Sequence, residues 1–443
     1  MTKSFSRDGI TIGTAFSGIG APEEALRKLN LKHKVLFACD IDKHAKEAYL
    51  ANNSLEEEYF FEDITLMNVT NFKDHLDVYI GGSPCQSFST YGKQLGLNDD
   101  RGNLFKHYIK IIEQSFPKYF IWENVSSVLT NDKGKSWEVI QNEFSNLCQG
   151  KKNRSYSIQY IIINSNEIGF PQNRSRIFVI GSRRDNIDSL DIWKPLQVER
   201  DKTAIDLLDK DLSILNEFPP IKDKKLEFVT SPKCDKNGYT RIHNTKSPHE
   251  NNGLFACQTA RQITNWHGNF VYHPLDKSQS GSIQPSQVFA NRFVSITQWN
   301  EFMSSSKNRA QFLKYFKEMK AHEATLSLSL PFVSGDSIEH GINNYQAVCR
   351  YLFVKYQGKV EFGPHGIIRP TTPRENLRLM GFSDSFKIVT SNSQTYKQAG
   401  NSMVVDVIAH LLEQLFTKQK NRPKNFIRAK ELTSSKTKEI FSI

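Results

Sequence analysis

The sequence has few cysteines, and they are not arranged to hold a metal ion or to build a disulfide framework. Only 6 of the 443 residues are cysteine, and no two of them have the CxxC spacing that is typical of structural zinc sites. Sparse, widely separated cysteines are typical of proteins in a reducing compartment. We therefore expect a cytoplasmic protein without a bound metal.

A long apolar run and a signal peptide are also missing. No stretch reaches the roughly 20 consecutive apolar residues of a membrane span, and residues 1–10 show no signal-peptide pattern. We therefore expect no membrane partner. The composition, with 38% hydrophobic and 24% charged residues, is that of an ordinary globular protein with an ample core. The length allows two domains or one enlarged domain.

The chain has fewer acidic than basic residues. The chain has 47 acidic residues against 58 lysines and arginines, which gives a net charge of +11. A basic protein favours an anionic partner, and nucleic acid is the commonest one. Because many basic proteins bind no nucleic acid, the charge alone does not identify the partner.

The first ordered pattern is a strand followed by a glycine turn and a helix. Residues 9–16 predict the strand, SGIG forms the turn and APEEALRKL predicts the helix. This unit is typical of nucleotide-binding folds. The full GxGxxG pattern is absent, and Phe16 suits stacking on a base better than cradling phosphates. Tight packing between strand and helix explains Gly18 and Gly20 equally well.

Acidic residues follow the next two expected strands. KVLFACD ends at Asp40, about 20 residues after the glycines, where nucleoside-binding sheets carry the carboxylate that binds the ribose. The alternative is that Asp40 or Asp42 caps a helix over residues 43–51. Asp63, in EDIT, is expected near the end of a third short strand, where it would accept a hydrogen bond from an exocyclic amine.

The stretch GGSPCQSFS, residues 81–89, carries the candidate nucleophile. An apolar run at residues 77–80 predicts a buried strand, and the two glycines allow a sharp turn after it. Cys85 therefore falls at the carboxyl end of a strand, where open α/β sheets bind ligands. A thiol there is an effective nucleophile, although an inert buried cysteine is the common alternative. Residues 86–102 predict a mobile loop.

Two further segments place charged side chains at strand ends. A strand at residues 119–122 delivers Glu123 beside an aromatic residue, where a raised pKa would suit a proton donor. The alternative is a structural carboxylate. Arg174 and Arg176 alternate in an extended segment and project to one side, which suits a phosphate or a carbonyl oxygen. A surface salt bridge is the alternative for this pair.

The periodic patterns define the expected domains. Residues 1–190 are regular, whereas residues 191–368 mix polar and aromatic residues that are typical of base and phosphate contacts. We expect one helix near residues 308–323, an extended entry into a helix at residues 369–382, and a glycine turn followed by a long amphipathic helix within residues 395–416. The expected organisation is a first domain of residues 1–190 completed by 396–417, a second domain of 191–368, a hinge of 369–395, and a basic, flexible or loosely docked tail of 418–443.

The ordered set of motifs resembles the DNA (cytosine-5)-methyltransferase family of bacterial restriction–modification systems. The blocks are FSGIG, ACDID, EDIT, GGSPCQSFS, RGNLF, ENV, QNRSR, RPTTPRENLRLMGF and YKQAGNSM, and they occupy about half of the chain. Met403 replaces a frequent valine and Met380 a frequent glutamine, and we expect neither change to touch the chemistry. The middle region, residues 190–368, shows no usable match to the family's motifs.

The resemblance implies a fold and a set of site residues. The implied fold is α/β, a doubly wound, mostly parallel S-adenosylmethionine-dependent methyltransferase sheet with a smaller target-recognition domain. Cys85 would be the nucleophile, Glu123 would grip the cytosine ring nitrogen and amine, Arg176 would hold the cytosine carbonyl oxygen with Arg174 as its support, and Lys93 would touch a DNA phosphate. The residues implied to bind S-adenosylmethionine are Phe16, Gly18, Gly20, Asp40 (ribose), Ile41 (adenine ring), Asp63 (adenine amine), Leu104, Asn401 and Ser402.

The implied activity is sequence-specific methylation of carbon 5 of a cytosine that is flipped out of duplex DNA, through a covalent cysteine adduct. A monomer in the bacterial cytoplasm would protect host DNA from a cognate restriction endonuclease. The same chemistry on tRNA and a catalytically silent DNA-binding regulator are the alternatives. A Rossmann oxidoreductase is disfavoured by the missing third glycine. The sequence does not reveal the recognised DNA site.

Overall fold

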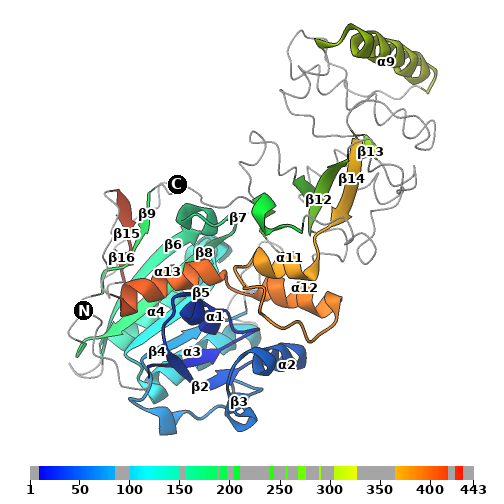
Figure 1. Ribbon diagram of the computed structural model, residues 1–443. Coiled ribbons are helices and arrows are strands. Elements are labelled where there is room, and N and C mark those ends of the chain that lie inside the picture. Colours follow the sequence, from blue (N-terminus) through cyan, green and yellow to red (C-terminus); the bar gives the residue numbers. More distant parts are fainter. Residues whose placement is uncertain are drawn as a thin grey trace. The chain divides into compact units, whose positions relative to one another are not determined.

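The computed structural model divides the chain into two compact units (Figure 1). The larger unit comprises residues 1–202 and 376–443, and the smaller unit comprises residues 203–375. The sequence placed its boundaries at 190/191 and 368/369, and the roles given to those segments stay predictions. The structure describes residues 9–84, 100–149, 155–186, 190–196, 204–209, 240–243, 255–257, 268–275, 289–290, 304–326, 365–417 and 425–432.

An eight-stranded sheet forms the centre of the larger unit. Its order is β16-β6-β8-β5-β4-β1-β2-β3. The five strands from β5 to β3 pair in parallel, whereas β8 is antiparallel to β5 and β6, and β16 is antiparallel to β6. The strands are β1 (Ile10–Ala15), β2 (His33–Cys39), β3 (Phe60–Phe61), β4 (Val78–Gly81), β5 (Tyr119–Val125), β6 (Tyr156–Asn164), β8 (Ser175–Arg183) and β16 (Lys430–Glu431).

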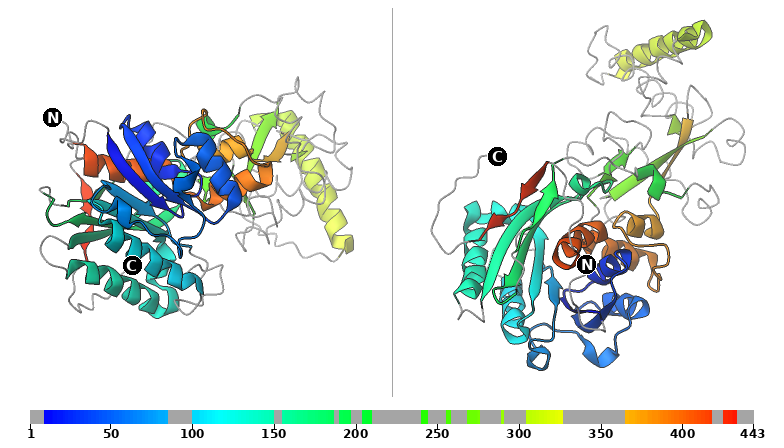
Figure 2. Two further views of the ribbon diagram at one scale, coloured as in Figure 1. Left: turned by 90° about the horizontal axis from the view of Figure 1, so that it is seen from below. Right: turned by 60° about the vertical axis from the view of Figure 1, so that its left-hand side comes forward.

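Helices cover both faces of this sheet. Figure 2 shows α3 and α4 on one face and α1 and α13 on the other. The expected mostly parallel, doubly wound α/β fold is confirmed. The helices of this unit are α1 (Ala21–Lys28), α2 (Lys43–Asn52), α3 (Asp100–Ser115), α4 (Lys135–Cys148), α12 (Asn392–Asn401) and α13 (Val405–Phe416), and α11 (Pro373–Arg378) lies at the unit boundary. Short elements are η1 (Glu57–Tyr59), η2 (Thr70–Phe72), η4 (Ser126–Leu129), η5 (Asn131–Gly134), η6 (Ser165–Ile168), β7 (Gln172–Asn173), β9 (Trp193–Pro195) and β15 (Phe426–Arg428).

The strand order creates a topological switch point between β1 and β4. The chain builds β1, β2 and β3 outward in one direction and then returns to place β4 and β5 on the other side of β1. Crevices at the carboxyl ends of strands beside such a switch point are where open α/β sheets bind ligands. The sheet thus predicts where the site lies before any side chain is considered.

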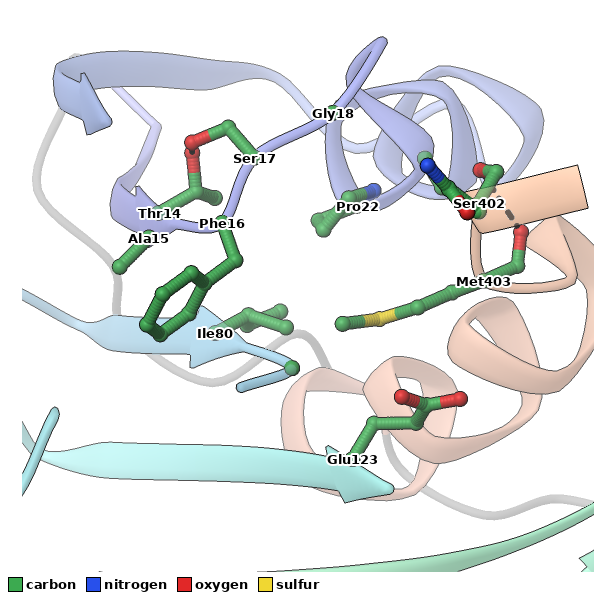
Figure 3. A pocket seen from close by; sticks show the side chains of 13 residues that line it. Thr14, Ala15, Phe16, Ser17, Gly18, Pro22, Ile80, Glu123, Ser402 and Met403 are labelled. Carbon is green, nitrogen blue, oxygen red and sulfur yellow. Dashed lines mark hydrogen bonds between the residues drawn. The ribbon is translucent and has the colours of Figure 1, made fainter. Parts of the chain in front are cut away.

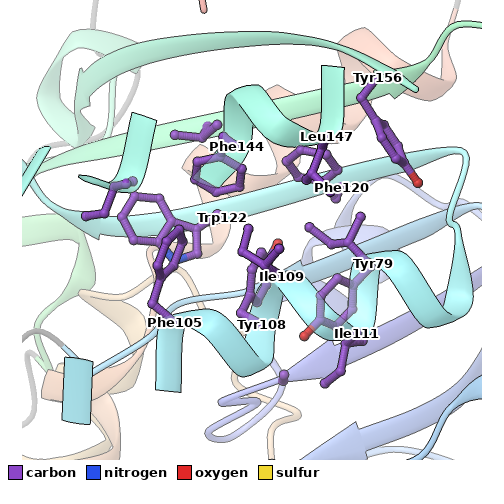
Figure 4. Packing of buried hydrophobic residues seen from close by; sticks show 14 of the residues in the cluster. Tyr79, Phe105, Tyr108, Ile109, Ile111, Phe120, Trp122, Phe144, Leu147 and Tyr156 are labelled. Atoms are coloured by element: carbon purple, nitrogen blue, oxygen red, sulfur yellow. The ribbon is translucent and has the colours of Figure 1, made fainter. Parts of the chain in front are cut away.

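Side chains of β5 alternate between the two faces of the sheet. Phe120 and Trp122 join the buried cluster beneath α3 and α4, where Phe120 stacks on Phe144 at a centroid distance of 5.7 Å (Figure 4). Tyr119 points the other way and contacts Phe416 of α13 at 5.5 Å. The two-residue period of a strand therefore directs Glu123 to the same face as Tyr119.

Capping residues define where the first two helices begin. Pro22 lies in the first turn of α1, together with Glu23 and Glu24, and acidic residues there complement the helix dipole. Asp42 caps α2 by accepting a hydrogen bond from the His44 N–H at 2.9 Å. Of the two aspartates considered from the sequence, Asp42 is therefore the helix cap and Asp40 is not.

The smaller unit contains a four-stranded sheet of order β10-β12-β14-β13. β10 and β12 are parallel, and β14 is antiparallel to both β12 and β13. Next to β14, Arg369 and Glu375 form a fully buried ion pair with N···O distances of 2.6 and 2.7 Å. The elements of this unit are η7 (Ala204–Leu207), β10 (Thr240–His243), β11 (Phe255–Ala256), β12 (Gly268–Leu275), β13 (Phe289–Ala290), α9 (Ser306–Leu326) and β14 (His365–Pro370).

Two sequence-based expectations at the C-terminal end were wrong. Residues 395–416 were expected to form a glycine turn followed by a long amphipathic helix; the helix is present as α13, but residues 395–401 belong to α12, and Gly400 sits in its last turn. A single glycine costs a helix only about 1 kcal/mol, so packing overrides it. The tail of 418–443 was expected to be flexible or loosely docked, but in its described part, residues 425–432, β15 pairs with β9 and β16 pairs with β6. No helix among the described residues is long and apolar enough to span a bilayer.

The docked tail predicts a stability effect that depends on position. Leu432 is 4% exposed, belongs to the main core cluster and donates its N–H to the Ile158 carbonyl at 2.9 Å. Leu432→Ala is expected to lower the free energy of unfolding by about 2–3 kcal/mol in urea denaturation. Ile427→Ala, at a site 42% exposed in the same segment, is the control and should cost less than about 1 kcal/mol. Equal effects of the two changes would contradict docking of the tail.

Candidate functional site

A pocket opens at the carboxyl ends of β1, β4 and β5, on the side of the sheet that α1 and α13 cover (Figure 3). It combines the turn after β1, the end of β4, the end of β5 and the connection between α12 and α13. The pocket is lined by Thr14, Ala15, Phe16, Ser17, Gly18, Ala21, Pro22, Ile80, Gly82, Glu123, Asn401, Ser402 and Met403. Five residues that the sequence had singled out therefore lie around one pocket.

The turn after β1 has an unusual backbone. Phe16 and Gly18 have φ angles of 52° and 53°, and Gly20 has 89°. A positive φ is uncommon for a non-glycine residue, so Phe16 holds a strained conformation at the pocket. A Cβ atom on Gly18 would meet nothing within 4 Å, whereas one on Gly20 would lie 2.6 Å from Asn53 Nδ2. Gly18 thus leaves the backbone open to a ligand, and Gly20 allows close packing against α2.

Asp40 is tied to this turn. Its carboxylate accepts the Gly18 N–H at 2.8 Å and the Asp42 N–H at 2.9 Å. Burial raises the pKa of Asp40, although both backbone hydrogen bonds oppose the change. The bond to Gly18 fixes the carboxylate beside the turn, and this position suits recognition of hydroxyl groups on a ligand in the pocket.

Five of the nine predicted cofactor residues do not line the pocket: Gly20 and Asp40, described above, and Ile41, Asp63 and Leu104. Ile41 is 83% exposed beside Asp40. The Asp63 carboxylate accepts the hydroxyl and the N–H of Thr65, both at 2.8 Å, and these bonds lower its pKa. Leu104 is half-buried and packs against the main core cluster. The roles given to these residues stay predictions.

Glu123 forms an ion pair with the second arginine of the QNRSR segment. Arg176 Nε lies 3.1 Å from Glu123 Oε1, and the two side chains are only 17% and 13% exposed. Arg176 also donates to the Ser175 carbonyl at 2.8 Å. A paired carboxylate and guanidinium in a half-enclosed pocket present an acceptor edge and a donor edge side by side.

Arg174 performs a different task from Arg176. Its side chain is buried, and Nη2 donates to the carbonyl oxygens of Gly400 and Ser402 at 3.1 and 2.9 Å. These carbonyls flank Asn401, which lines the pocket with Ser402. Arg174 therefore ties the start of β8 to the segment that closes the pocket from the C-terminal side.

The last described residues before the candidate nucleophile are attached to β5. Trp122 Nε1 donates to Ser83 Oγ at 3.2 Å, and Asn124 Nδ2 donates to the Ser83 carbonyl at 3.3 Å. Gly82, immediately before Ser83, lines the pocket. Cys85 and Lys93 lie outside the residues that the structure describes.

Met403, where the family often has valine, also lines the pocket, and its side chain points across it toward Ile80 (Figure 3). The expectation that this change does not touch the chemistry stays a prediction. Its Cε would be 3.1 Å from a Cβ atom on Gly82. Met403 directly follows two predicted site residues, and this adjacency was the signal that the sequence offered.

Polar contacts that the sequence did not reveal hold the C-terminal segment in place. Lys397 pairs with Asp42 at 2.6 Å, and Gln398 Nε2 donates to the His44 carbonyl at 2.8 Å. Lys28 pairs with Asp406 at 2.6 Å. Exposed ion pairs contribute little stability one by one, but together these contacts fix the register of α12 and α13 against α1 and α2.

Comparison with known families gives one match that spans most of the chain. The model described as "C-5 cytosine-specific DNA methylase" matches residues 10–417. The orphan methyltransferase M.SPRI of Bacillus phage SPR is 28% identical over 452 residues, covering 92% of this chain and 97% of the relative. The type II methyltransferase M.HhaI of Haemophilus parahaemolyticus is 26% identical over 404 residues, covering 91% of this chain and 93% of the relative.

Solved structures share the fold at low sequence identity. The methyltransferase EhMeth of Entamoeba histolytica aligns with a TM-score of 0.56 at 17% identity, covering 93% of this chain and 99% of its own. The Dnmt2 methyltransferase of S. pombe aligns with a TM-score of 0.55 at 16% identity, covering 92% and 98%. At these identities the likeness concerns the fold alone.

The close packing at Gly82 predicts how the pocket responds to one added methyl group. A Cβ atom there would lie 2.9 Å from Glu123 Oε2 and 3.1 Å from Met403 Cε. Gly82→Ala should therefore displace Glu123, lengthen its ion pair with Arg176 and lower the free energy of unfolding by about 1–3 kcal/mol. A crystal structure and urea denaturation of the variant measure both effects.

The same change in a Met403→Val background is the control, because it removes the second contact. We expect the displacement of Glu123 to persist there. A wild-type ion-pair distance in Gly82→Ala, with only Met403 moved, would show that the space under Gly82 does not position Glu123.

Proposed function

The chain belongs to the C-5 cytosine-specific DNA methylase family, and we propose from this membership that it methylates carbon 5 of cytosine in duplex DNA with S-adenosylmethionine as the methyl donor. It is thus an enzyme of the DNA (cytosine-5)-methyltransferase class. The finer points proposed here are the covalent cysteine adduct, the flipped base and the residues that carry each step.

One observation supports the proposal most strongly. The strained turn at Phe16 and Gly18 and the carboxylate of Glu123 line the same pocket, beside the switch point of the sheet. Methyl transfer requires a donor and an activated ring within bonding distance of each other. A single pocket with a nucleoside-type turn on one wall and a carboxylate–guanidinium pair on another meets that requirement.

The residues of the turn fit S-adenosylmethionine. Gly18 leaves open space beside its backbone, and the Asp40 carboxylate is fixed next to it as an acceptor for ribose hydroxyls. Asn401 and Ser402 offer polar groups on the opposite wall. When bound, the cofactor supplies an electrophilic methyl group on a sulfonium. The proposed contacts of Gly20, Ile41, Asp63 and Leu104 follow from family membership.

The remaining residues would activate the ring. Carbon 5 of cytosine is too weakly nucleophilic to accept a methyl group unaided, so the Cys85 thiolate adds to carbon 6 while Glu123, acting as an acid, gives the ring nitrogen a proton. Glu123 grips that nitrogen and the exocyclic amine, and Arg176 holds the carbonyl oxygen on which charge develops. After carbon 5 takes the methyl group, a base removes the proton from carbon 5, the carbon–sulfur bond breaks and the ring nitrogen returns its proton to Glu123, which restores the thiolate and the aromatic ring.

The ion pair with Arg176 offsets the free-energy cost of burying the Glu123 carboxylate in the pocket. A lone buried charge would be costly, and the Arg176 guanidinium at 3.1 Å compensates that of Glu123. An entering cytosine offers an amine to Glu123 and a carbonyl oxygen to Arg176, so it replaces part of the hydrogen bonding that each group gives the other.

The target base must leave the helix for this chemistry. Extrusion costs a few kcal/mol and needs contacts that hold the duplex and fill the vacated space. We assign DNA reading to the second domain expected over residues 191–368, with 369–395 as the hinge, and a phosphate contact to Lys93. Closure over the base is assigned to the loop expected at 86–102, shortened to 86–99 because residues 100–102 belong to α3. Action as a monomer and protection of host DNA against a cognate endonuclease complete the proposal.

The nucleophile assignment predicts a separation of binding from chemistry. Cys85→Ala should bind S-adenosylmethionine within about threefold of the wild type, because the thiol forms a bond only with the base. Transfer of a tritiated methyl group to duplex DNA should fall below detection. Cys148→Ala, at a thiol on α4 that contacts the Phe144 carbonyl, is the control and should keep full transfer. Methylation by Cys85→Ala would overturn the mechanism.

The nucleic-acid class is tested separately. Bisulfite sequencing of DNA from a host that expresses the chain should reveal fully protected cytosines within one short sequence. Duplex DNA and tRNA offered together to the purified enzyme should direct tritium into DNA. Label in tRNA alone would retain the chemistry and reject DNA as the substrate.

A further inference from the structure

The carboxyl group of Glu23, which has no part in the proposed chemistry, is buried beneath the turn at residues 17–20. Glu23 of α1 is fully buried. Its Oε1 accepts the Tyr49 hydroxyl at 2.5 Å and the Thr14 hydroxyl at 3.2 Å. Its Oε2 has no hydrogen-bond partner among the described residues. A buried polar atom without a partner is costly, so its presence asks for an explanation.

Hydroxyl groups connect Glu23 to the lining of the pocket. Thr14 Oγ1 lies 2.8 Å from Ser17 Oγ, and Ser17 Oγ accepts the Cys39 N–H at 2.9 Å. The Ser17 N–H in turn donates to the Cys39 carbonyl at 2.9 Å. Thr14 and Ser17 both line the pocket, and Asp40 follows Cys39 directly. These hydrogen bonds therefore connect Glu23 of α1 to the turn after β1 and to the end of β2, directly before Asp40.

The charged groups around Glu23 do not favour an ionised carboxylate. Among the residues that the structure describes, the only cation near it is Arg27 on its own helix, whose guanidinium bonds to Glu24 and to Asn53 Oδ1, both at 2.8 Å. From α2 it faces the hydroxyl of Tyr49, and from β1 the hydroxyl of Thr14. Burial raises the pKa of Glu23 above its ordinary value, against the hydrogen bonds from Tyr49 and Thr14.

We propose that Glu23 keeps its proton in the folded enzyme and acts as a positioning residue for the cofactor turn at residues 17–20, through Thr14 and Ser17. A neutral acid accepts both hydroxyl bonds at Oε1 without placing a bare charge in the core. The inference rests on the proposed function only in naming the pocket as the cofactor site. The protonation and the hydrogen-bond chain concern the fold itself.

The chain offers a matched comparison in the next residue. Glu24 is also buried on α1, but it pairs with Arg27 at 2.8 Å and accepts the Ser383 N–H at 3.1 Å. Burial opposes its ionisation, yet the bonds from Ser383 and Arg27 outweigh burial and lower its pKa. The pKa values of two adjacent buried glutamates are therefore shifted in opposite directions.

Because protonation is linked to folding, the opposite pKa shifts of Glu23 and Glu24 predict opposite pH dependences of the free energy of unfolding. The unfolded chain loses the Glu23 proton near pH 4.5, before the folded chain does, so wild-type stability falls relative to Glu23→Gln as the pH rises toward the folded pKa. For Glu24 the folded chain loses its proton first, so wild-type stability rises relative to Glu24→Gln over the acidic range. Urea unfolding of the three proteins measures both slopes, for Glu24 below about pH 5 and for Glu23 above about pH 4.5, so the series has to extend from about pH 3 to about pH 8.

Kinetics test the positioning role. Glu23→Gln keeps a neutral group of the same shape and should leave KM for S-adenosylmethionine within about threefold of wild type, whereas Glu23→Ala should raise it about tenfold with a smaller change in kcat. Calorimetric binding of S-adenosylmethionine gives the same comparison without DNA. Glu23→Met fills a similar volume without accepting the Tyr49 and Thr14 hydroxyl bonds, so it should raise KM as Glu23→Ala does, whereas rescue by methionine as well as glutamine would indicate packing alone.

Several outcomes would overturn the inference. They are a pH-independent stability difference between wild type and Glu23→Gln, a slope with the sign found for Glu24→Gln, or equal loss of cofactor binding in Glu23→Gln and Glu23→Ala. These results are independent of the Cys85→Ala experiment. If methyl transfer failed while the Glu23 slope held, the proposed function would fall and the protonated acid would stand.

Discussion

The Arg174 guanidinium is the contact on which closure of the pocket depends. One wall comes from residues near position 16 and another from residues near position 402, so the chain must return across the whole sheet to complete the site. Arg174 holds that return through two carbonyl oxygens at 3.1 and 2.9 Å. A guanidinium suits the task because its rigid donors reach separate acceptors from one buried position. Without it, two carbonyls would lose their donor inside the fold, at a cost of about 1–3 kcal/mol for each.

The strand pattern and the motif order were sufficient to predict a mostly parallel, doubly wound sheet with site residues at the carboxyl ends of its strands. Phe16 and Gly18 follow β1, Glu123 lies near the end of β5, and the carboxyl ends of parallel strands meet at one edge of the sheet. Met403 was missed because the sequence was compared by residue type, and a departure from valine carries no information about which way a side chain points. The docked tail was missed because β15 and β16 are too short and polar to show strand periodicity.

Ion pairing and burial divide the acids around this pocket into distinct states. Glu123 lies against Arg176 and presents a carboxylate edge to the pocket. Asp40 accepts two backbone N–H groups, which support its charge although burial opposes it. Glu23, one layer deeper, meets only hydroxyl groups through its single bonded oxygen. Asp40 and Glu23 are thus both opposed by burial, but two backbone N–H groups donate to Asp40, whereas only hydroxyl side chains donate to Glu23.

The position of each carboxyl group, at the pocket surface or buried beneath the turn, matters for a site that binds a positively charged methyl donor. A carboxylate at the pocket surface attracts a sulfonium and an ammonium group directly, whereas one buried beneath the turn would add little attraction and would destabilise the fold. A protonated Glu23 avoids that cost and still fixes Thr14 and Ser17, so the turn is held by neutral hydrogen bonds while the charge stays with Asp40 and Glu123. The strained φ of Phe16 supports this division of roles, since a strained residue persists only where its surroundings over-determine its conformation.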